Sequence, residues 1–161
     1  MSEIFKVGMA DLKVCKAPDA LTTIGLGSCV GICLWDTSSG VGGLAHIMLP
    51  DSTKLNNNSN ICKFADTGID ELIRQMTKAG AVRARIKAKI AGGAGMFAFQ
   101  SSNEALQIGK ANVEAVRSKL LAERIPLIAE ETGGSIGRTI IFYPQTGKMV
   151  IRTVRGPDME I

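Results

Sequence analysis

Cys29 and His46 are the side chains whose types and spacing best suit nucleophilic catalysis. Cys29 lies in the small-residue segment Gly25-Leu26-Gly27-Ser28-Cys29-Val30-Gly31, and the only histidine of the chain, His46, follows in Gly43-Leu44-Ala45-His46-Ile47-Met48-Leu49-Pro50. A thiol beside an imidazole is the minimal apparatus of a cysteine hydrolase or an acyl transferase. The alternative interpretation is structural, with a packed core thiol and a hydrogen-bonded core histidine.

The segment between these two residues predicts a β-hairpin. Residues 30–35 and 41–49 are apolar runs, and the turn-forming residues 36–40 separate them. Apolar residues dominate both faces of the two runs, so we expect both strands at the centre of a sheet that is covered on both sides. Such a hairpin folds His46 back towards Cys29.

The pairing register of the hairpin decides how close the two side chains come. If Asp36 pairs with Val41, His46 lies opposite Gly31, and Cys29 becomes its diagonal neighbour at about 7–8 Å between backbone positions. A register two residues shorter would place Cys29 and His46 directly opposite each other. Because Gly31 has no side chain, we expect the space between thiol and imidazole to be open.

A catalytic imidazole usually needs a third group that fixes its tautomer. The candidates are two loop carboxylates, Asp36 and Asp51, and two hydroxyls that precede the glycine-rich segment, Thr22 and Thr23. The residues alone do not rank these four.

The remaining pattern predicts an α+β fold in layers, with strands at both ends of the chain around a βαβ-like middle. The middle contains two predicted helices, the first capped by Asp66 or Thr67 and the second turning Leu121 towards the core. Between them, a strict alternation predicts a strand with a basic face. The predicted elements are short strands within 4–16, a loop at 51–60, helices at 65–79 and 109–123, strands at 83–90 and 125–130 (mutually parallel), and a closing hairpin of 139–143 and 148–154.

Composition limits the class of protein. A chain of 161 residues with 45% hydrophobic residues suits one domain, 1–161, around one core. The net charge of +4, without basic residues interleaved with aromatic ones, does not indicate nucleic-acid binding. The chain starts without the apolar core of a signal peptide, and no apolar run is long enough to span a bilayer, so we expect a cytoplasmic protein without membrane insertion.

Cysteine and glycine spacing argue against metals and nucleotide cofactors. Cys15, Cys29, Cys33 and Cys62 form no C-x-x-C pair, and one histidine is too few for a common zinc site. The glycine-rich segments 92–95 and 133–134 lack the G-K-[ST] ending of a phosphate loop and the full dinucleotide fingerprint. We therefore expect reduced thiols, no metal and no cofactor.

Several motifs together resemble the CheD family, the chemoreceptor glutamine deamidases of bacterial and archaeal chemotaxis. The similarity covers nearly the whole chain. Its motifs are Leu26-Gly27-Ser28-Cys29-Val30, Gly43-Leu44-Ala45-His46-Ile47-Met48-Leu49-Pro50, Gly92-Gly93-Ala94-Gly95-Met96-Phe97, Ile108-Gly109-Lys110-Ala111-Asn112 and Glu131-Thr132-Gly133-Gly134-Ser135-Ile136-Gly137-Arg138.

This resemblance implies a Cys-His-Thr triad, with Cys29 as nucleophile, His46 as base and Thr23 as the orienting hydroxyl. The family is similar in fold to the deamidase toxins of the cytotoxic necrotizing factor type, with helices packed on mixed sheets. It implies methyl-accepting chemoreceptors as substrates and the phosphatase CheC as a partner. With a thiolate attacking a glutamine carbonyl, the backbone N–H groups around Gly27 and Ser28 are candidate donors to the oxyanion.

Two further functions follow from the same resemblance. The acyl-enzyme route would also accept a glutamate methyl ester, which predicts a minor methylesterase activity. The alternative function is a non-catalytic adaptor that binds CheC and receptors. The predicted basic strand face, with Arg83, Arg85, Lys87 and Lys89, would suit that role.

Overall fold

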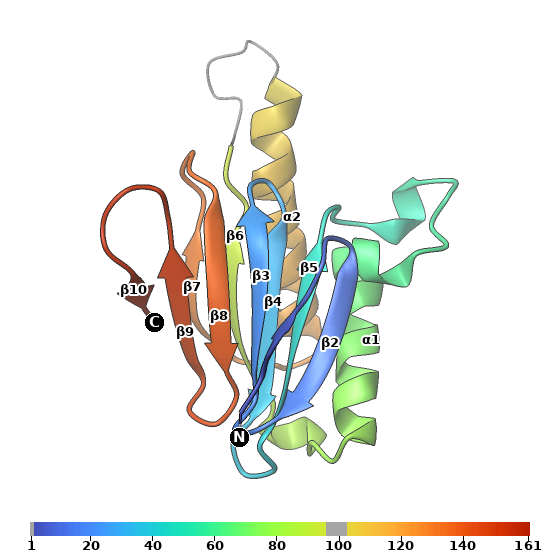
Figure 1. Cartoon of the computed structure of the whole chain (residues 1–161). Coiled ribbons are helices and arrows are strands. Elements are labelled where there is room, and N and C mark those ends of the chain that lie inside the picture. Colours follow the sequence, from blue (N-terminus) through green and yellow to red (C-terminus); the bar gives the residue numbers. More distant parts are fainter. Residues whose placement is uncertain (1, 96–102) are drawn as a thin grey trace.

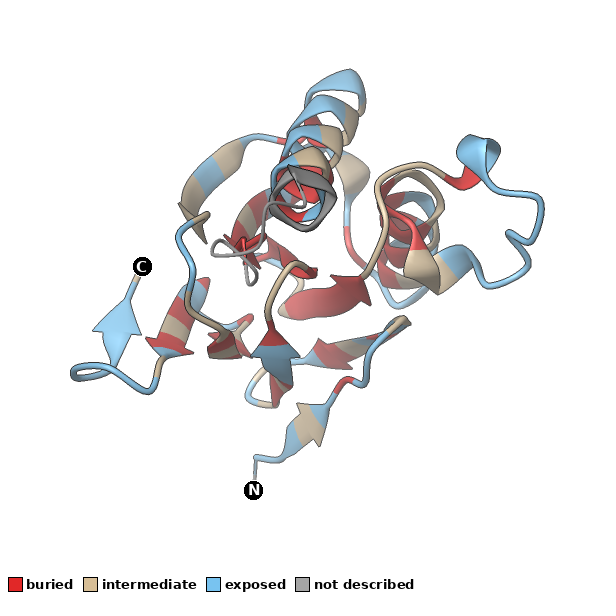
Figure 2. Cartoon of the chain, turned by 90° about the horizontal axis from the view of Figure 1, so that it is seen from above, coloured by how far each residue is buried: buried red, intermediate tan, exposed pale blue. Residues whose placement is uncertain are grey.

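Two five-stranded β-sheets lie face to face, and two helices cover the outer face of one of them (Figures 1 and 2). The computed structural model describes residues 2–95 and 103–161. Sheet A has the order β1-β3-β8-β9-β10, and sheet B has the order β2-β5-β4-β6-β7. The layers are therefore helices, sheet B and sheet A, which confirms the predicted α+β layered class with mixed sheets.

The strands of sheet A are β1 Ile4–Lys6, β3 Ala20–Leu26, β8 Arg138–Tyr143, β9 Lys148–Arg152 and β10 Met159–Glu160. Those of sheet B are β2 Asp11–Lys16, β5 Val41–Ile47, β4 Val30–Asp36, β6 Lys87–Gly92 and β7 Leu127–Thr132. The helices are α1 Ala65–Lys78 and α2 Asn103–Ala122, and the short 3₁₀ turns are η1 Ser52–Lys54, η2 Ile61–Lys63 and η3 Arg83–Arg85.

Sheet B separates two apolar cores. One core lies between sheet B and the helices, and the other lies between the two sheets. Every residue of β4 and β5 is buried, which confirms that the hairpin is central and covered on both sides. In that hairpin Asp36 pairs with Val41 and Gly31 pairs with His46, so the longer of the two registers considered is the one adopted.

Strand β3 is the element that the sequence pattern misses. Its burial does not alternate, because both Ile24 and Gly25 are exposed and the pairing with β8 shifts between Thr23 and Leu26. A strand that lacks the two-residue period gives no periodic signal. β3 carries Thr23, one of the predicted site residues.

Helix α1 matches its predicted span, but its predicted caps are wrong. Phe64 is the N-cap and makes no side-chain capping bond. The Thr67 hydroxyl donates instead to the Ile61 carbonyl at 2.6 Å, and the Asp66 carboxylate accepts from the backbone N–H and the hydroxyl of Ser52. Both side chains thus tie preceding segments to the helix.

The predicted basic strand is wrong over its first half. Residues 83–85 form η3, and β6 begins at Lys87. The Arg85 guanidinium binds the buried Asp36 carboxylate, Arg83 donates to the Glu123 carbonyl, and Lys89 donates to the Gly147 carbonyl. All three cations bind acceptors within the chain, and residues 83–85 are not in a strand, so the four basic residues do not form one continuous strand face.

The second predicted helix begins earlier than expected, since α2 already includes residues 103–108. Val113, Val116 and Leu120 are buried as predicted, but Leu121 is 79% exposed and does not face the core. β7 is parallel to β6, as expected for a helical crossover. Within the described residues, no helix combines the length and the apolar character needed to cross a membrane.

Candidate active site

Thr23, Cys29 and His46 lie towards the same end of the two sheets. Thr23 belongs to β3 of sheet A, His46 belongs to β5 of sheet B, and Cys29 lies in the loop between β3 and β4 (Figure 1). Leu44, two residues before His46 in β5, is buried in the core between the sheets, and so is Cys29. By the two-residue period of a strand, His46 faces sheet A, on the same side as Cys29.

A hydrogen bond joins the two sheets at the site. Thr23 Oγ1 lies 2.7 Å from His46 Nδ1 and 2.7 Å from the carbonyl oxygen of Val7. The carbonyl can only accept, so the single hydroxyl proton points to Val7. The hydroxyl oxygen must then accept the Nδ1–H of His46. The neutral imidazole therefore carries its proton on Nδ1 and has a lone pair on Nε2.

The other ring nitrogen of His46 is available as a base. Nε2 is buried and has no hydrogen-bond partner among the described residues. The residue is only 1% exposed, and burial lowers the pKa of the imidazole below its ordinary value of 6.5. A neutral imidazole with a free Nε2 lone pair is the form that can accept a proton.

Cys29 is a largely buried and poorly ionised thiol. It is 8% exposed, and burial raises its pKa above the ordinary 9.0, although its own backbone N–H partly opposes that shift. Because Nε2 lacks a partner in the described structure, no hydrogen bond yet joins it to Cys29 Sγ. The pair is therefore neutral at rest, and catalytic hydrogen bonds often tighten only when substrate binds.

The space beside Gly31 is not open, contrary to the prediction. A Cβ atom at this position would lie 2.9 Å from Cδ1 of Ile140 and 3.1 Å from Cδ1 of Leu26. The missing side chain thus makes room for two apolar side chains of sheet A. These side chains help to desolvate the site.

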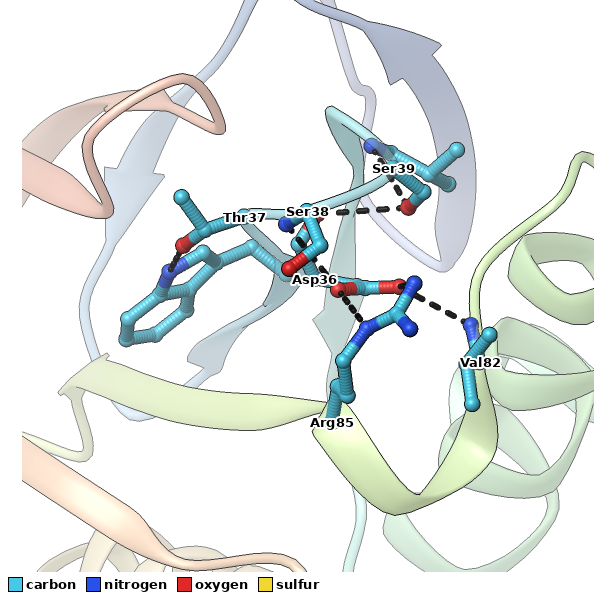
Figure 3. A network of polar contacts seen from close by, with 8 residues as sticks. Asp36, Thr37, Ser38, Ser39, Val82 and Arg85 are labelled. Atoms are coloured by element: carbon cyan, nitrogen blue, oxygen red, sulfur yellow. Dashed lines mark hydrogen bonds and ion pairs between the residues drawn. The ribbon is translucent and has the colours of Figure 1, made fainter.

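The other candidates for the third group do not lie at the imidazole. Asp36 is buried in the β4–β5 turn region, where it binds Arg85 and the Val82 N–H (Figure 3). Asp51 accepts from the N–H and hydroxyl of Thr53. The Thr22 hydroxyl donates to the Ile140 carbonyl at 2.7 Å. Of the four, only Thr23 contacts His46.

Two backbone hydrogen bonds hold the loop that carries Cys29. The N–H groups of Gly93 and Ala94 each donate at 2.8 Å, to the carbonyls of Cys29 and Gly27 respectively. Gly92 has a φ of +111°, and a Cβ there would lie 2.3 Å from the Cys29 carbonyl oxygen, so only glycine permits this approach. The backbone amides of Ser28 and Cys29 hydrogen bond to no other described residue, which leaves them available as donors.

Asn112 of α2 is a site residue that the sequence interpretation missed. Its side-chain Nδ2 donates to the carbonyl of Ser28 at 2.9 Å and to that of Met48 at 3.0 Å, and the residue is fully buried. A signal existed, because Asn112 lies beside Val113 and one turn from Val116 on the core face of the helix. A polar residue at a core position requires partners.

The remaining features do not extend the site. Cys33 is fully buried, Cys15 is buried, and Cys62 is only partly exposed. Within residues 2–95 and 103–161, no cluster of three or more His, Cys, Asp or Glu side chains is arranged to hold a metal ion. Met96 and Phe97, the end of one resemblance motif, lie outside the described residues.

Comparison with known proteins identifies relatives along the entire chain. A family model described as CheD chemotactic sensory transduction matches residues 48–153. A probable chemoreceptor glutamine deamidase CheD of Lachnoclostridium phytofermentans is 56% identical over 161 residues, which is 100% of both chains. The chemoreceptor glutamine deamidase CheD of Halalkalibacterium halodurans is 50% identical over 162 residues, again 100% of both chains.

Solved structures share the fold at low sequence identity. A Neisseria meningitidis protein of the DUF152 family superposes with a TM-score of 0.53 at 9% identity, over 87% of this chain and 74% of that one. This similarity supports the layered α+β fold and carries no information on activity. The family model and the full-length relatives decide the family, and they agree with the resemblance found in the sequence motifs: the chain belongs to the CheD family.

Proposed function

We propose that this protein is a cysteine-dependent deamidase that converts chemoreceptor glutamines to glutamates, acting as a single cytoplasmic domain. Relatives identical at 50% and 56% of positions are named chemoreceptor glutamine deamidases. The observation that carries the proposed mechanism is the Thr23–His46 hydrogen bond of 2.7 Å, because it leaves the Nε2 lone pair of a buried imidazole free. Cys29 is the nucleophile, His46 the base and Thr23 the group that orients the base.

The first half of the reaction forms a thioester. Nε2 of His46 takes the proton of the Cys29 thiol as Sγ attacks the side-chain carbonyl carbon of a receptor glutamine. The N–H groups of Ser28 and Cys29 stabilise the negative charge that develops on the carbonyl oxygen, whereas the predicted Gly27 N–H donates to the Gly25 carbonyl at 3.1 Å and is not available. The tetrahedral intermediate then collapses, the C–N bond breaks, and the Nε2 proton leaves with ammonia.

The second half of the reaction restores the enzyme. Nε2 accepts a proton from water as the water oxygen attacks the thioester carbon. The C–S bond breaks, the thiol regains its proton from Nε2, and the glutamine has become glutamate. The overall change is consumption of one water and release of one ammonia. A glutamate methyl ester would enter the same route with methanol as the leaving group, so a minor methylesterase activity belongs to the proposal.

CheC remains a proposed partner through the family resemblance. The purely adaptor function rested on a basic strand face, which the structure divides between η3 and β6. Arg85 is bound to Asp36, Arg83 to the Glu123 carbonyl, and Lys89 to the Gly147 carbonyl. The Thr23–His46 hydrogen bond, which leaves the buried Nε2 free, supports the enzymatic function.

The decisive experiment compares Cys29→Ala with Cys33→Ala. Both replace a buried thiol of the core between the sheets, but Cys33 is 0% exposed within β4, whereas Cys29 is 8% exposed and lies in the loop before that strand. Receptor peptides are incubated with each variant, and mass spectrometry records the mass increase of about 1 Da that marks each conversion of an amide to an acid. We expect no conversion by Cys29→Ala and near wild-type conversion by Cys33→Ala. Conversion by Cys29→Ala would exclude the mechanism.

Alkylation tests the thiol independently of turnover. Burial raises the pKa of both thiols, but Cys33 is 0% exposed and Cys29 is 8% exposed. Iodoacetamide should therefore modify Cys29 much faster than Cys33 in the folded protein, as peptide mapping can record. Equal rates would favour a non-catalytic role for Cys29.

A further inference from the structure

Asn112 links α2 to the two segments that carry the nucleophile and the base. Its Nδ2 donates one hydrogen to the carbonyl of Ser28, the residue before Cys29, and the other to the carbonyl of Met48, two residues after His46. The side chain is fully buried, so no water competes for these bonds. One amide group thus sets the separation between the Cys29 loop and the end of β5.

The contact with Ser28 also orients a donor on the opposite side of the same peptide group. The carbonyl of Ser28 and the N–H of Cys29 belong to one planar trans peptide, so they point in opposite directions. Holding the carbonyl on Asn112 therefore fixes the direction of the Cys29 N–H. That N–H hydrogen bonds to no other described residue.

The neighbouring peptide groups are held by backbone alone. The carbonyls of Gly27 and Cys29 accept from the N–H groups of Ala94 and Gly93. The Ser28 carbonyl lies between them in sequence and is the one that a side chain holds. Substitution of Asn112 can therefore release this peptide group while leaving the two adjacent backbone contacts in place.

Asn112 leaves one of its own polar atoms unpaired. Its Oδ1 is buried and has no hydrogen-bond partner among the described residues. An unpaired buried acceptor is unfavourable, and an apolar residue would avoid it. The two donor bonds are what an asparagine contributes at this position.

We propose that Asn112 is a positioning residue that holds the Ser28–Cys29 peptide so that the Cys29 N–H points at the developing oxyanion. This inference rests on the proposed deamidase function and deepens it. Because the Cys29 N–H would act mainly in the transition state, loss of Asn112 should lower kcat and leave KM nearly unchanged.

The test compares Asn112→Leu with Asn112→Asp and Val116→Ala. Leucine keeps the approximate volume and removes both donors. A buried aspartate kept neutral by its surroundings has one O–H and can hold only one of the two carbonyls. Val116→Ala weakens the packing of the same helix one turn further on, within the core that faces sheet B, without touching either carbonyl.

We expect kcat to fall about 10–100-fold in Asn112→Leu, less in Asn112→Asp, and less than twofold in Val116→Ala, with KM within twofold throughout. Thermal melting checks that each variant is folded. Unchanged kcat in a folded Asn112→Leu, or a loss confined to KM, would overturn the inference. If Asn112→Leu does not fold, Asn112→Asp decides by the same criteria.

Failure of this inference is distinguishable from failure of the proposed function. If Cys29→Ala still releases ammonia, the cysteine mechanism fails whatever Asn112 does. If Cys29→Ala is inactive and the folded Asn112 variants keep wild-type kcat, the mechanism stands and only the positioning role is rejected.

Discussion

The hydroxyl of Thr23 has two partners, and together they decide which nitrogen of His46 carries the proton. Because the hydroxyl donates to the Val7 carbonyl, it can only accept from Nδ1. In enzymes with a Ser-His-Asp triad, a carboxylate performs this orientation and also stabilises the imidazolium. A neutral hydroxyl can orient the ring but adds little charge stabilisation. This difference suits a site where thiol and imidazole are both neutral at rest.

Removal of the Thr23 hydroxyl should lower kcat, because this hydroxyl selects the tautomer of His46. Thr23→Val keeps the shape but leaves Nδ1–H without an acceptor, and we expect kcat to fall about 10–100-fold. The unpaired group should also destabilise the fold by about 1–3 kcal/mol. Thr23→Ser should stay within a few-fold of wild type. Ammonia release and thermal melting measure the two effects.

Thr22→Val is the matched control for this prediction. The Thr22 hydroxyl donates to the Ile140 carbonyl from the same strand, so its loss also removes a hydrogen bond of β3. It should lower stability without lowering kcat appreciably. Equal losses of kcat in the two valine variants would reject the orienting role of Thr23.

The pH dependence of activity follows from the burial of His46. The base must be neutral, and burial lowers its pKa below 6.5. The acid limb of kcat/KM should therefore have its midpoint below pH 6.5, and activity should persist through neutral pH. Initial rates of ammonia release across pH 4.5–8.5, about the range over which a histidine titrates, provide the measurement; a midpoint at or above 6.5 contradicts it.

The same shift affects stability with a definite sign. The folded protein disfavours imidazolium, so as pH falls through 6.5 the unfolded chain takes up the proton first. The contribution of His46 to the free energy of unfolding is thus present above pH 6.5 and lost below it. His46→Gln should show a weaker decline between pH 7 and pH 5 in denaturant titrations.

At the scale of elements, the β4–β5 hairpin is fixed at both ends by different means. At one end, hydrogen bonds from the N–H groups of Gly93 and Ala94 hold the Cys29 loop. At the other end, the carboxylate of Asp36 accepts from Arg85 at 2.9 and 3.0 Å, from the Val82 N–H at 2.9 Å, and from the Ser38 N–H at 3.2 Å (Figure 3). This carboxylate connects the turn to the segment before β6. It maintains the register that places His46 opposite Gly31.

Asp36→Asn should therefore lower stability without altering chemistry. The carboxylate is fully buried, but Arg85 is 45% exposed and remains partly hydrated, so we expect a loss of about 2–3 kcal/mol, below that of a fully buried pair. kcat should be unchanged at temperatures well below melting. A denaturant titration with parallel rate measurements tests both statements.

The control is Asp158→Asn, which breaks the exposed pair with Arg152, where both side chains are at least half exposed. We expect a change below about 1 kcal/mol. The pKa of Asp36 lies well below 3.8, so its contribution to stability is present above pH 3.8 and lost as pH falls further. Equal destabilisation by the two variants would contradict the structural role of Asp36.

At the scale of the whole molecule, the site depends on how the two sheets dock. Thr23 belongs to sheet A and His46 to sheet B, so their hydrogen bond reports the spacing between layers. Leu26 and Ile140 of sheet A fill the space at Gly31 of sheet B. Docking of these apolar surfaces brings Thr23 and His46 together and buries both side chains.

Gly31→Ala should push the sheets apart at the site. Its Cβ would lie 2.9 Å from Ile140 Cδ1, and we expect a destabilisation of about 1–3 kcal/mol together with a lower kcat. Adding Ile140→Val removes that methyl group, so the double variant should recover part of both losses. Such non-additivity is typical of residues in contact.

Gly43→Ala is the control that distinguishes general overpacking from a change in the spacing between the two sheets. Its Cβ would meet Leu72 Cδ1 at 2.5 Å, on the face of sheet B that packs against the helices. It should destabilise the fold while leaving the Thr23–His46 spacing and kcat largely intact. A similar loss of kcat in the folded Gly31→Ala and Gly43→Ala proteins would show that general overpacking, rather than sheet spacing, limits activity.

The sequence by itself determined the hairpin and its burial on both faces, because local turn chemistry and apolar runs encode these features. It left two registers open, and the structure adopts the longer one. The sequence also determined the family, through motifs along nearly the whole chain. The residues did not rank the four candidate partners of His46, and the resemblance alone implied Thr23. The tertiary structure shows the contact, which no local pattern encodes because Thr23 arrives from the other sheet by a strand without a two-residue period. It likewise overruled the first half of the strand predicted at 83–90, where residues 83–85 form η3 and Arg85 binds the buried Asp36 carboxylate. Contacts between residues distant in sequence carry no local periodic signal, which is why the two carbonyl partners of Asn112 and the contact of Thr23 with Val7 became visible only in the folded chain.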